Sequence, residues 1–593
     1  MKLIGWILSG VLLAMPALAQ ETADAVAPET TTALGAAELD AAIAAAQSAK
    51  AAGQPVAAQN WMLSVANPYA AQVGARVLLE GGTAADAMVA VQAVLGLVEP
   101  QSSGLGGGAF LVWYDAKTDT LSTLDGRETA PLAARPTLFQ DESGEPLKFF
   151  DAVVGGRSVG VPGTPALMQE AHRRWGRAKW AGLFSGAISL ADDGFEVSSR
   201  LADMVGRDIP RLGRDPVARQ YFLPEGQPLR AGQLLKNPAY AKSLRDLAGM
   251  GVGPFYTGNL AKEIVAKVRG DLTNPGVLSE IDFALYEVRE RPPVCAAYRG
   301  YDICGMGAPS SGGLTVGQIL GMLEQHDLTS SGDANTWRLI GDASRLGFAD
   351  RGRYIADSDF VPVPTKGLLA PDYLAKRGEL LNGETALTDV QPGEPEFDHS
   401  LNLADDEAIE LPSTSHISIV DSYGNALSMT TTIENAFGSR LMVGGFLLNN
   451  ELTDFSFRSH KNGVPIANRV APGKRPRSSM APTIVLKDGK PVIVVGSPGG
   501  SRIIPYVAKT LIAHLDWGMN AQEAVALPHL INRFGTYDVE ESTPAVALAP
   551  ALRDLGYEVK ARALNSGLHM IVLGADGLSG GADPRREGVV LGN

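Results

Sequence analysis

Thr414 is the residue of this chain whose position best suits it to act as a nucleophile. It lies between Leu411 and Asp421, where a loop-forming sequence that includes Pro412 runs into a strand-forming one. This stretch looks like a place where a precursor cuts itself between Ser413 and Thr414. A chain that begins with threonine carries a complete nucleophile, because the hydroxyl attacks and the threonine's own α-amine takes up the proton. The alternative Ser/Thr/Cys–His–Asp arrangements need a separate base.

The residues that follow Thr414 are expected to form a β-hairpin. Residues 414–420 and 426–433 read as two strands joined by a short turn. If the last residue of the first strand pairs with the first residue of the second, apolar residues face apolar ones and polar residues face polar ones. A slip of one residue would scramble this match. The register places the hydroxyl of Thr432 beside Thr414, where it can orient the nucleophile; the alternative is that Thr432 is simply a good strand residue.

Cys295 and Cys304 are the two cysteines of the chain, and their spacing suits a hairpin. A hairpin that turns between residues 298 and 301 sets the cysteines directly opposite each other. If 298 and 301 form a hydrogen-bonded pair, the cysteines form a non-hydrogen-bonded pair, in which side chains are closest. In an oxidising compartment we therefore expect a disulfide. The alternative is two separate small buried side chains.

The bulk properties of the chain indicate a large globular protein that is exported. It has 593 residues and a formal net charge of -14. The acidic balance argues against nucleic acid, which needs a basic face. A lysine, an apolar run over residues 3–15 and an Ala-x-Ala pattern ending at Ala19 predict a signal peptide over residues 1–19. The protein is then periplasmic or secreted, with no stable membrane anchor after cleavage; the alternative, a membrane anchor, needs a longer apolar run.

Local signals divide the N-terminal part of the chain into a leader and two helices. Residues 20–55 are rich in Ala, Thr and Glu, and we interpret them as a flexible leader with a helix near 37–50. Asn67 followed by proline predicts the start of a helix that runs to Glu80. Thr83 is expected to cap a second helix through Val98. The packed domain thus begins near residue 60.

The remainder of the chain is expected to change from mainly helical to mainly extended. The predicted elements are a glycine-dense turn at 100–110 and a hairpin through 124, helices within 160–290 and 335–385, an exposed acidic loop at 386–413, strands from 414 onward, a helix near 505–525 and closing strands within 557–575.

Several segments, in the right order from about residue 60 to the C-terminus, resemble the gamma-glutamyltransferase family, which belongs to the N-terminal nucleophile hydrolases. The segments that carry the resemblance are Pro100–Phe110, Asp125–Pro131, Thr414–Asp421, Phe446–Ser456, Lys474–Thr483 and Gly496–Arg502. The resemblance implies an α+β fold, a four-layer αββα sandwich of two mostly antiparallel sheets. It also implies autocleavage before Thr414 into a large subunit, 56–413, and a small catalytic subunit, 414–593, that stay associated.

The resemblance implies an activity as well. The enzyme would transfer or hydrolyse the γ-glutamyl group of glutathione and related compounds, and pass it to water or to an amino-acid or dipeptide acceptor. Thr414 would form the acyl-enzyme, with Thr432 beside it. Gly499 and Gly500 match glycines whose backbone N–H groups stabilise the oxyanion, where small residues let the backbone come close to the substrate. No metal or organic cofactor is implied.

Further matched residues would bind the amino-acid head of the glutamyl group. Arg127 matches the arginine that grips the α-carboxylate, and Ser478 and Ser479 match hydroxyl donors to the same carboxylate. Glu451 and Asp454 match the acids that hold the α-ammonium. A zwitterionic head needs this division of charge. Without the resemblance, each of these residues would more readily be an ordinary surface charge.

Two departures from the family pattern concern the substrate. Glu434 stands two positions after Thr432, where family members carry asparagine. This additional acid either strengthens ammonium binding or marks a different acyl donor. The loop 457–473 is shorter than in members with a full lid, so we expect it to cover the donor pocket only partly.

Two other hypotheses stay open. The first is a glutaryl- or cephalosporin-type acylase on the same scaffold; a glutaryl group has no ammonium, so the acids at Glu434, Glu451 and Asp454 favour a γ-glutamyl donor. The second is an unprocessed, non-catalytic periplasmic binding protein, against which the intact Thr414 and its matched partners argue. The eight histidines have no metal-binding spacing.

Overall fold

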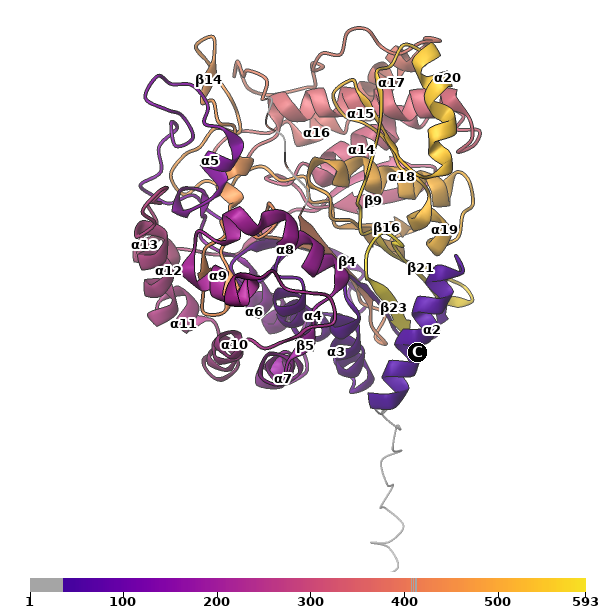
Figure 1. Cartoon of the computed structure of the whole chain (residues 1–593). Helices are drawn as coiled ribbons and strands as arrows, with labels where there is room; N and C mark the ends of the chain where they lie inside the picture. Colours follow the sequence, from indigo (N-terminus) through magenta and orange to yellow (C-terminus); the bar gives the residue numbers. More distant parts are fainter. Residues whose placement is uncertain (1–35, 407, 409, 411–412) are drawn as a thin grey trace, which may run out of the picture.

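The computed structural model describes residues 36–406, 408, 410 and 413–593 (Figure 1). The predicted signal peptide, 1–19, and residues 20–35 lie outside the described residues. Helix α2 (Ala36–Ala51) corresponds to the helix expected near 37–50. It packs on strand β23 (Val589–Gly592), and its Leu39 is buried. The helix expected within the leader is therefore present and lies against the sheet.

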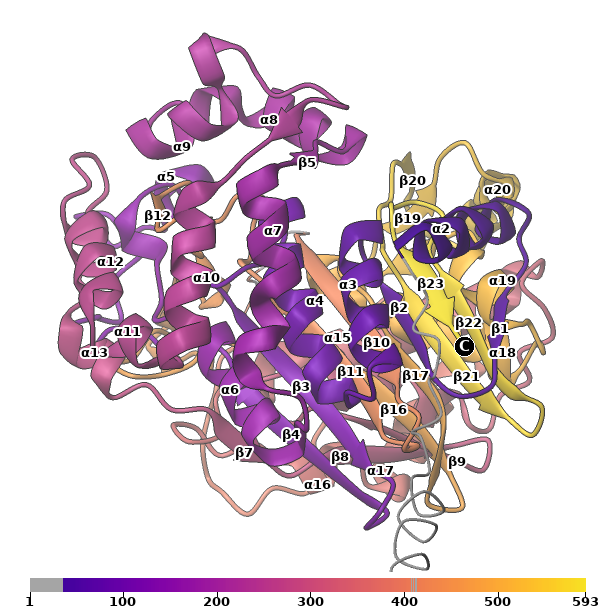
Figure 2. The ribbon, with the colours of Figure 1, turned by 90° about the horizontal axis from the view of Figure 1, so that it is seen from below.

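Two seven-stranded sheets form the centre of the molecule, and helices cover both outer faces (Figures 1 and 2). The nucleophile sheet has the order β23, β2 (Met62–Val65), β10 (Thr414–Val420), β11 (Ala426–Thr432), β3 (Gly108–Asp115), β4 (Thr120–Gly126) and β7 (Arg289–Arg291). The second sheet has the order β1 (Val56–Ala58), β22 (Gly577–Ala582), β21 (His569–Gly574), β17 (Lys490–Gly496), β16 (Thr483–Lys487), β9 (Tyr301–Gly305) and β8 (Val294–Tyr298). Their strand pairs are antiparallel.

Three apolar cores hold these layers together. The nucleophile sheet packs on α3 (Pro68–Leu79), α4 (Ala84–Val98), α6 (Thr164–Trp175), α7 (Ser185–Asp193) and α10 (Pro238–Met250). The second sheet packs on α14 (Gly312–Leu323), α15 (Ala334–Tyr354), α18 (Ile503–Leu515) and α19 (Ala521–Ala526). A smaller core that includes Val420 and Val494 lies between the sheets. The predicted four-layer αββα sandwich is confirmed.

Both sheets mix strands from the two sides of residue 413. In the nucleophile sheet, β10 pairs with β2 and β11 pairs with β3. In the second sheet, β16 pairs with β9 and β22 pairs with β1. The two segments that a cut before Thr414 would produce are therefore hydrogen-bonded to each other along both sheets.

Local capping explains the first two helices. The side chain of Asn67 accepts a hydrogen bond of 2.9 Å from the backbone N–H of Tyr69, at the start of α3. Thr83 and Asp86 form a reciprocal capping box at the start of α4. Both helices have the predicted bounds within one residue. The helix expected near 505–525 is instead two helices, α18 and α19, and strands β22 and β23 were not predicted.

Smaller elements complete the helical layers and the edges of the sandwich. They are α5 (Phe149–Val153), α8 (Ser199–Leu212), α9 (Pro216–Phe222), α11 (Gly253–Tyr256), α12 (Asn259–Arg269), α13 (Glu280–Ala284), α16 (Thr365–Leu368), α17 (Pro371–Gly378), α20 (Ala549–Asp554) and the strands β18 (Leu530–Asn532), β19 (Tyr537–Glu540) and β20 (Val559–Arg562). No helix in the described part of the chain is long and apolar enough to cross a membrane.

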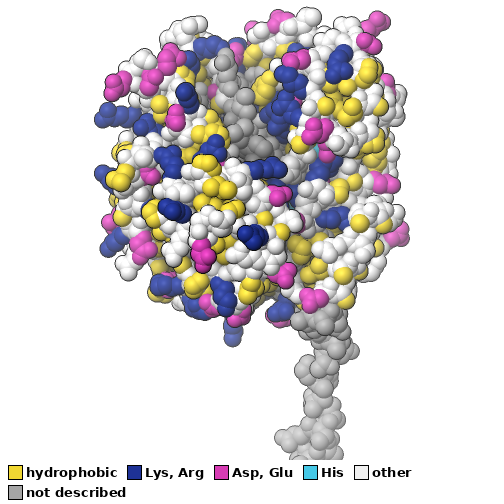
Figure 3. All heavy atoms as spheres, viewed as in Figure 1, with side chains coloured by type: hydrophobic (Ala, Val, Ile, Leu, Met, Phe, Trp, Pro, Cys, Tyr) yellow, Lys and Arg dark blue, Asp and Glu magenta, His cyan; other side chains and the backbone are white. Residues whose placement is uncertain are grey.

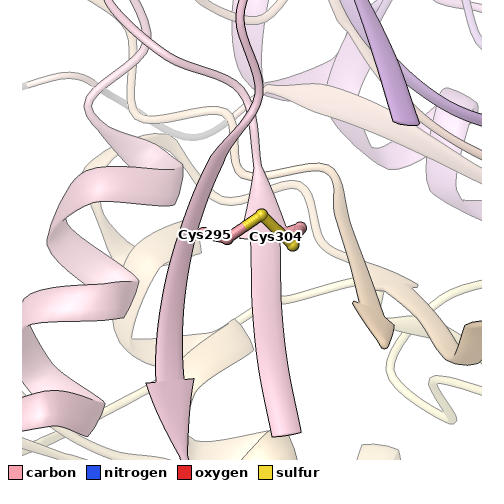
Figure 4. Close-up of a disulfide and its surroundings, with 2 residues drawn as sticks. All are labelled: Cys295 and Cys304. Carbon is pink, nitrogen blue, oxygen red and sulfur yellow. A yellow bond between two sulfur atoms is a disulfide. The ribbon is translucent and has the colours of Figure 1, made fainter. Parts of the chain in front are cut away.

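The cysteine hairpin has the predicted register. Strands β8 and β9 pair Tyr298 with Tyr301 and Cys295 with Cys304. The two cysteines are joined in a disulfide (Figure 4), and their Cα atoms are 4.1 Å apart. This separation is close to that of a non-hydrogen-bonded antiparallel pair, as the register requires.

Candidate active site

Thr414 is the first residue of β10, and its hydroxyl begins a chain of hydrogen bonds. The predicted register is confirmed, since Thr414 lies opposite Thr432 on β11. The Thr414 hydroxyl donates to Oγ1 of Thr432 at 3.3 Å. The Thr432 hydroxyl donates in turn to the carbonyl oxygen of Ser413 at 2.8 Å. The nucleophile and the carbonyl of the bond before it are thus tied to one side chain.

Glu434 fixes the Thr432 hydroxyl from the other side. Its backbone N–H donates to Oγ1 of Thr432 at 2.9 Å. Glu434 has a φ of 73°, in the left-handed region that residues other than glycine rarely adopt. Its carboxylate accepts a hydrogen bond from the side-chain amide of Asn450. This conformation lets one residue serve Thr432 with its backbone while its side chain reaches the pocket beside Thr414.

His416 is near Thr414 in sequence but belongs to the packing of the hairpin. Its ring nitrogens bond to the hydroxyls of Thr430, at 2.8 Å, and Ser418, at 3.0 Å. Burial, and then the neighbouring His569, lower the pKa of His416 well below its usual value. The ring is therefore neutral at neutral pH and is satisfied by the strands' own hydroxyls, as the expected packing role requires.

A pocket at the start of β10 brings most of the predicted site residues together. Its lining residues are Arg127, Glu410, Thr414, Thr432, Glu434, Glu451, Asp454, Ser478, Met480 and Gly500. Gly499 and Ser479 are outside this lining. A side chain at Gly499 would strike the ring of Tyr506, and its φ of 143° also favours glycine. The Ser479 hydroxyl accepts a hydrogen bond of 2.8 Å from Arg351.

Arg127 is the centre of charge in the pocket. Its guanidinium donates to the carboxylates of Glu451 and Asp454, the latter at 2.5 Å. It also donates to the backbone carbonyls of Pro476 and Arg477. The arginine and the two acids, to which the resemblance assigns opposite ends of a zwitterion, therefore bind each other directly. Buried charges are stable only when they are paired in this way.

Burial and charge shift the protonation of these groups in different directions. Burial raises the pKa of the Glu451 carboxyl, although Arg127 opposes the shift. Burial, and then the negative charge of Glu410, raise the pKa of Asp454 well above its usual value. Burial lowers the pKa of Arg127, but the two acids outweigh it and raise the pKa overall. Arg127 is therefore permanently charged, whereas the charge on the acids depends on what lies beside them.

Glu410 is a pocket residue that sequence analysis missed. Its carboxylate accepts hydrogen bonds from the Arg351 guanidinium and, at 2.8 Å, from the backbone N–H of Ser479. It lies in the acidic segment that was expected to be only an exposed loop, yet its side chain is buried. Nothing local in the sequence distinguishes Glu410 from its acidic neighbours, because its partners come from α15 and from the segment before β16.

Arg586 and Glu99 hold the nucleophile strand from behind and were also missed. Arg586, between β22 and β23, donates to the carbonyl oxygen of Thr414 at 2.9 Å. The hydroxyl of Ser415 donates to the carboxylate of Glu99 at 3.0 Å. Both charged groups are buried; burial raises the pKa of Glu99 and lowers that of Arg586 to about 9. Their contacts fix the backbone on which the Thr414 hydroxyl is presented.

The loop 457–473 contributes no residue to the lining of the Thr414 pocket. It contains a short hairpin, β14 (His460–Lys461) and β15 (Val464–Pro465), which projects from the body near α5 in Figure 1. Phe457 at its base stacks on Phe139 with ring centres 4.8 Å apart. In the described part of the chain, no group of three or more His, Cys, Asp or Glu side chains is placed to hold a metal ion.

Thr414 is the first residue of a central strand, and the strand belongs to one of two antiparallel sheets that lie between helical layers. This arrangement is that of an N-terminal nucleophile hydrolase. Among solved structures, the cephalosporin acylase of Bacillus halodurans superimposes with a TM-score of 0.81 at 26% identity, covering 91% of this chain and 97% of that one. The sequence model described as gamma-glutamyltranspeptidase matches residues 70–593. The chain therefore belongs to the gamma-glutamyltranspeptidase family.

Two relatives of similar sequence carry different names. A glutathione hydrolase proenzyme of Bacillus subtilis strain 168 is 37% identical over 547 residues, which cover 90% of this chain and 91% of the relative. An acylase proenzyme of Pseudomonas sp. strain SE83 is 33% identical over 548 residues, which cover 90% of this chain and 94% of that relative.

Proposed function

We propose that this protein cuts itself between Ser413 and Thr414 and then uses Thr414 to cleave γ-glutamyl amides, glutathione among them. The observation that carries the proposal is the hydrogen-bond chain from Thr414 through Thr432 to the Ser413 carbonyl, at the mouth of a pocket with Arg127 and two acids. Family membership and the relative named glutathione hydrolase proenzyme support the same activity.

Self-cleavage begins with attack of the Thr414 hydroxyl oxygen on the carbonyl carbon of Ser413. The C–N bond between the two residues breaks, the proton passes to the released nitrogen, and an ester links Ser413 to the Thr414 oxygen. Water then hydrolyses the ester, leaving a carboxylate on Ser413 and a free α-amine on Thr414. Thr432 assists because its hydroxyl already donates to the oxygen that becomes negative.

The turnover that follows uses the new α-amine as the base. It takes the proton of the Thr414 hydroxyl, whose oxygen attacks the γ-carbonyl carbon of the donor. The amine of the donor leaves with a proton, and a γ-glutamyl ester remains on Thr414. Water, or an amino acid or dipeptide, then attacks this ester. The backbone N–H groups of Gly499 and Gly500 are our candidates for the oxyanion site, since Gly500 lines the pocket and both turn sharply there.

The α-amino-acid head of the donor is assigned to Arg127, Glu451 and Asp454. The α-carboxylate of the donor would bind the guanidinium of Arg127, and its α-ammonium would bind the carboxylates of Glu451 and Asp454. The head would thus replace ion pairs that these residues now make with one another, so that no buried charge is left unpaired. Glu434, which also lines the pocket, would be a third acid near the ammonium. The Ser478 hydroxyl would donate a hydrogen bond to the carboxylate of the head. Ser479 would act through Arg351, whose guanidinium it binds.

An acylase acting on glutaryl-type amides is the second candidate. The acylase relative and the superposition on the cephalosporin acylase favour it. A glutaryl carboxylate would compete with Glu451 and Asp454 for Arg127, but such a substrate brings no ammonium to compensate these two acids. This cost makes a γ-glutamyl donor the better match to the pocket.

Processing and location follow from the same proposal. We infer a signal peptide over residues 1–19, a large subunit that ends at residue 413 and a small subunit over 414–593, which remain associated. The protein would act in the periplasm or outside the cell, where the disulfide of Cys295 and Cys304 is stable.

The test combines intact mass, N-terminal sequencing and release of the amine from a γ-glutamyl anilide. We expect two chains, one beginning Thr-Ser-His-Ile, and turnover of the anilide. Thr414→Ala should give a single uncut chain without activity. Cleavage of that variant at the same bond would reject Thr414 as the nucleophile. Two chains without anilide turnover, but with turnover of a glutaryl amide, would favour the acylase.

A further inference from the structure

A second cavity, which we call the arginine chamber, lies next to the Thr414 pocket and has no role in the proposed chemistry so far. It has a volume of about 400 Å³, in the range of small-molecule sites. Its lining residues are Arg345, Phe348, Ala349 and Gly352 from α15, Val390, Gln391 and Pro392, Asp405 and Asp406, and Arg533 and Phe534. In Figure 3, Lys and Arg side chains gather on the part of the surface where Figure 1 places α15 and α16.

Two contacts link the lining of the chamber to that of the Thr414 pocket. The guanidinium of Arg533 donates to the hydroxyl of Ser501, which directly follows the pocket residue Gly500. On α15, Arg351 lies less than one turn from Phe348 and binds the pocket residue Glu410. Through these two contacts, the lining of the chamber is connected to residues that line the pocket or lie next to its lining.

Arg533 is a partly buried cation with little negative charge close to it. Among the described residues, the one carboxylate within 4.0 Å of its guanidinium is Asp538, at 3.7 Å. That carboxylate is held more closely by Arg502, at 2.7 Å, and by Arg562, at 2.9 Å. Burial, and then repulsion from Arg502, lower the pKa of Arg533 to about 10, so the side chain is charged at neutral pH. A carboxylate in the chamber would therefore meet a guanidinium that is only weakly paired.

The other charged groups of the chamber are already paired. Their closest partners are Asp342 for Arg345 at 2.8 Å, Arg353 for Asp405 at 2.8 Å and Arg477 for Asp406 at 2.8 Å. Neither acid of the chamber is therefore available to neutralise Arg533. Among the described residues that line the chamber, Arg533 is therefore the charged group with the weakest ion pair.

The walls beside Arg533 are apolar and aromatic. The rings of Phe348 and Phe534 meet edge to face with centres 5.3 Å apart. The Arg533 guanidinium lies 5.3 Å from the centre of the Phe534 ring. Walls of this kind favour a small organic molecule over a hydrated inorganic ion. The guanidinium of an arginine matches the geometry of a carboxylate.

We propose that the arginine chamber binds the amine half of the substrate, with the carboxylate of a peptide-like leaving group or acceptor on Arg533. This inference rests on the function proposed above, which puts the glutamyl head at Arg127 and so directs the amine away from it. Gly500 and Ser501 are neighbours, about 3.8 Å apart at Cα, and a dipeptide spans about 7 Å. The proposal therefore requires a cysteinylglycine group attached at the Thr414 hydroxyl to extend past Gly500 to the guanidinium that is bound to Ser501.

The test compares substrates that differ in one carboxylate. We would measure kcat/KM for glutathione, for its glycyl ethyl ester and for a γ-glutamyl anilide, which has no carboxylate on its amine half. The wild-type protein should prefer glutathione to the ester roughly tenfold to a hundredfold, the effect of one charge-assisted hydrogen bond. Arg533→Gln should abolish the preference and lower kcat/KM for glutathione far more than for the anilide, and Arg533→Lys should retain part of the preference.

Arg562→Gln is the matched control, because Arg562 shares Asp538 with Arg533 but does not line the chamber. It should keep the wild-type preference. Equal losses for all three substrates in Arg533→Gln would mean that Arg533 only supports Ser501, and would overturn the proposal, as would an unchanged preference.

The proposed function is tested separately by turnover of the anilide. If the wild-type protein turns over neither the anilide nor glutathione, calorimetric titration with glycylglycine and with its C-terminal amide still decides the question. Binding of the dipeptide but not of the amide, lost in Arg533→Gln, supports the chamber. Equal binding of both, or of neither, refutes it.

Discussion

Thr432→Val should strongly reduce the rate of self-cleavage and still allow the protein to fold. The substitution keeps the shape of the side chain and removes a hydroxyl that donates to the Ser413 carbonyl and accepts from Thr414 and from the backbone of Glu434. The lost donor points at the oxygen that becomes an oxyanion when Thr414 attacks. Valine offers nothing in its place, because it favours the same strand position without any polar atom.

The expected magnitude follows from these contacts. Removing one preorganised donor to an oxyanion costs about 2.7–4 kcal/mol of activation free energy, which is roughly 100- to 1,000-fold in rate. The backbone N–H of Glu434 also loses its acceptor, and an unpaired buried donor costs about 1–3 kcal/mol of folding free energy. The variant should therefore fold, with a reduced free energy of unfolding, and persist as an uncut precursor.

The assay is the rate at which newly made chain splits into two bands, followed by electrophoresis and intact mass. Thr432→Ser keeps the hydroxyl and should process at close to the wild-type rate. Thr430→Val is the control for losing a buried strand hydroxyl, since Thr430 bonds to His416 and not to Ser413. If Thr432→Val splits as fast as the wild-type protein, the Ser413 carbonyl is not activated by this hydroxyl and the reasoning fails.

Other properties of the site and the fold can be tested in the same preparation. Arg127→Lys should raise KM for the anilide roughly tenfold to a hundredfold with little change in kcat, because lysine cannot reproduce the fork to a carboxylate; an unchanged KM would remove Arg127 from the head-binding role. Because burial and Glu410 raise the pKa of Asp454, its carboxyl gains charge only as pH rises through that raised value, so KM should fall over the same range. Asp454→Asn should flatten the KM–pH profile, and a wild-type profile that is already flat would contradict the ammonium role. Replacing Cys295 and Cys304 by serine opens a short loop and should lower the free energy of unfolding by about 2–3 kcal/mol in denaturant titrations, unless the hairpin is already rigid without its disulfide.

Local patterns predicted the parts of this structure that local forces determine. The caps at Asn67 and Thr83 set the first two helices, because a side chain and a backbone N–H two or three residues later satisfy each other. The pairing of Thr414 with Thr432 followed from matching polar with polar residues across one short turn. In both cases the interacting residues are close in sequence.

The parts that were not predicted depend on contacts between distant segments. Glu410 becomes a pocket residue only because Arg351 lies beside it in space, and Arg586 reaches the Thr414 carbonyl across 172 positions of the chain. The glycine-rich strand β22 has weak strand signals of its own and is set by its neighbours on both sides. Ser479 was matched to the substrate by resemblance, whereas its hydroxyl binds Arg351.

The mixing of strands from both sides of residue 413 has a consequence for the cut protein. Strand β10 keeps β2 beside it, and β11 keeps β3, so the two products are held by continuous backbone ladders rather than by a surface contact. Separating them would mean unfolding the molecule. Specific activity should then be independent of dilution, and mixing two inactive variants, one altered in each product, should restore nothing, because partners once formed do not exchange.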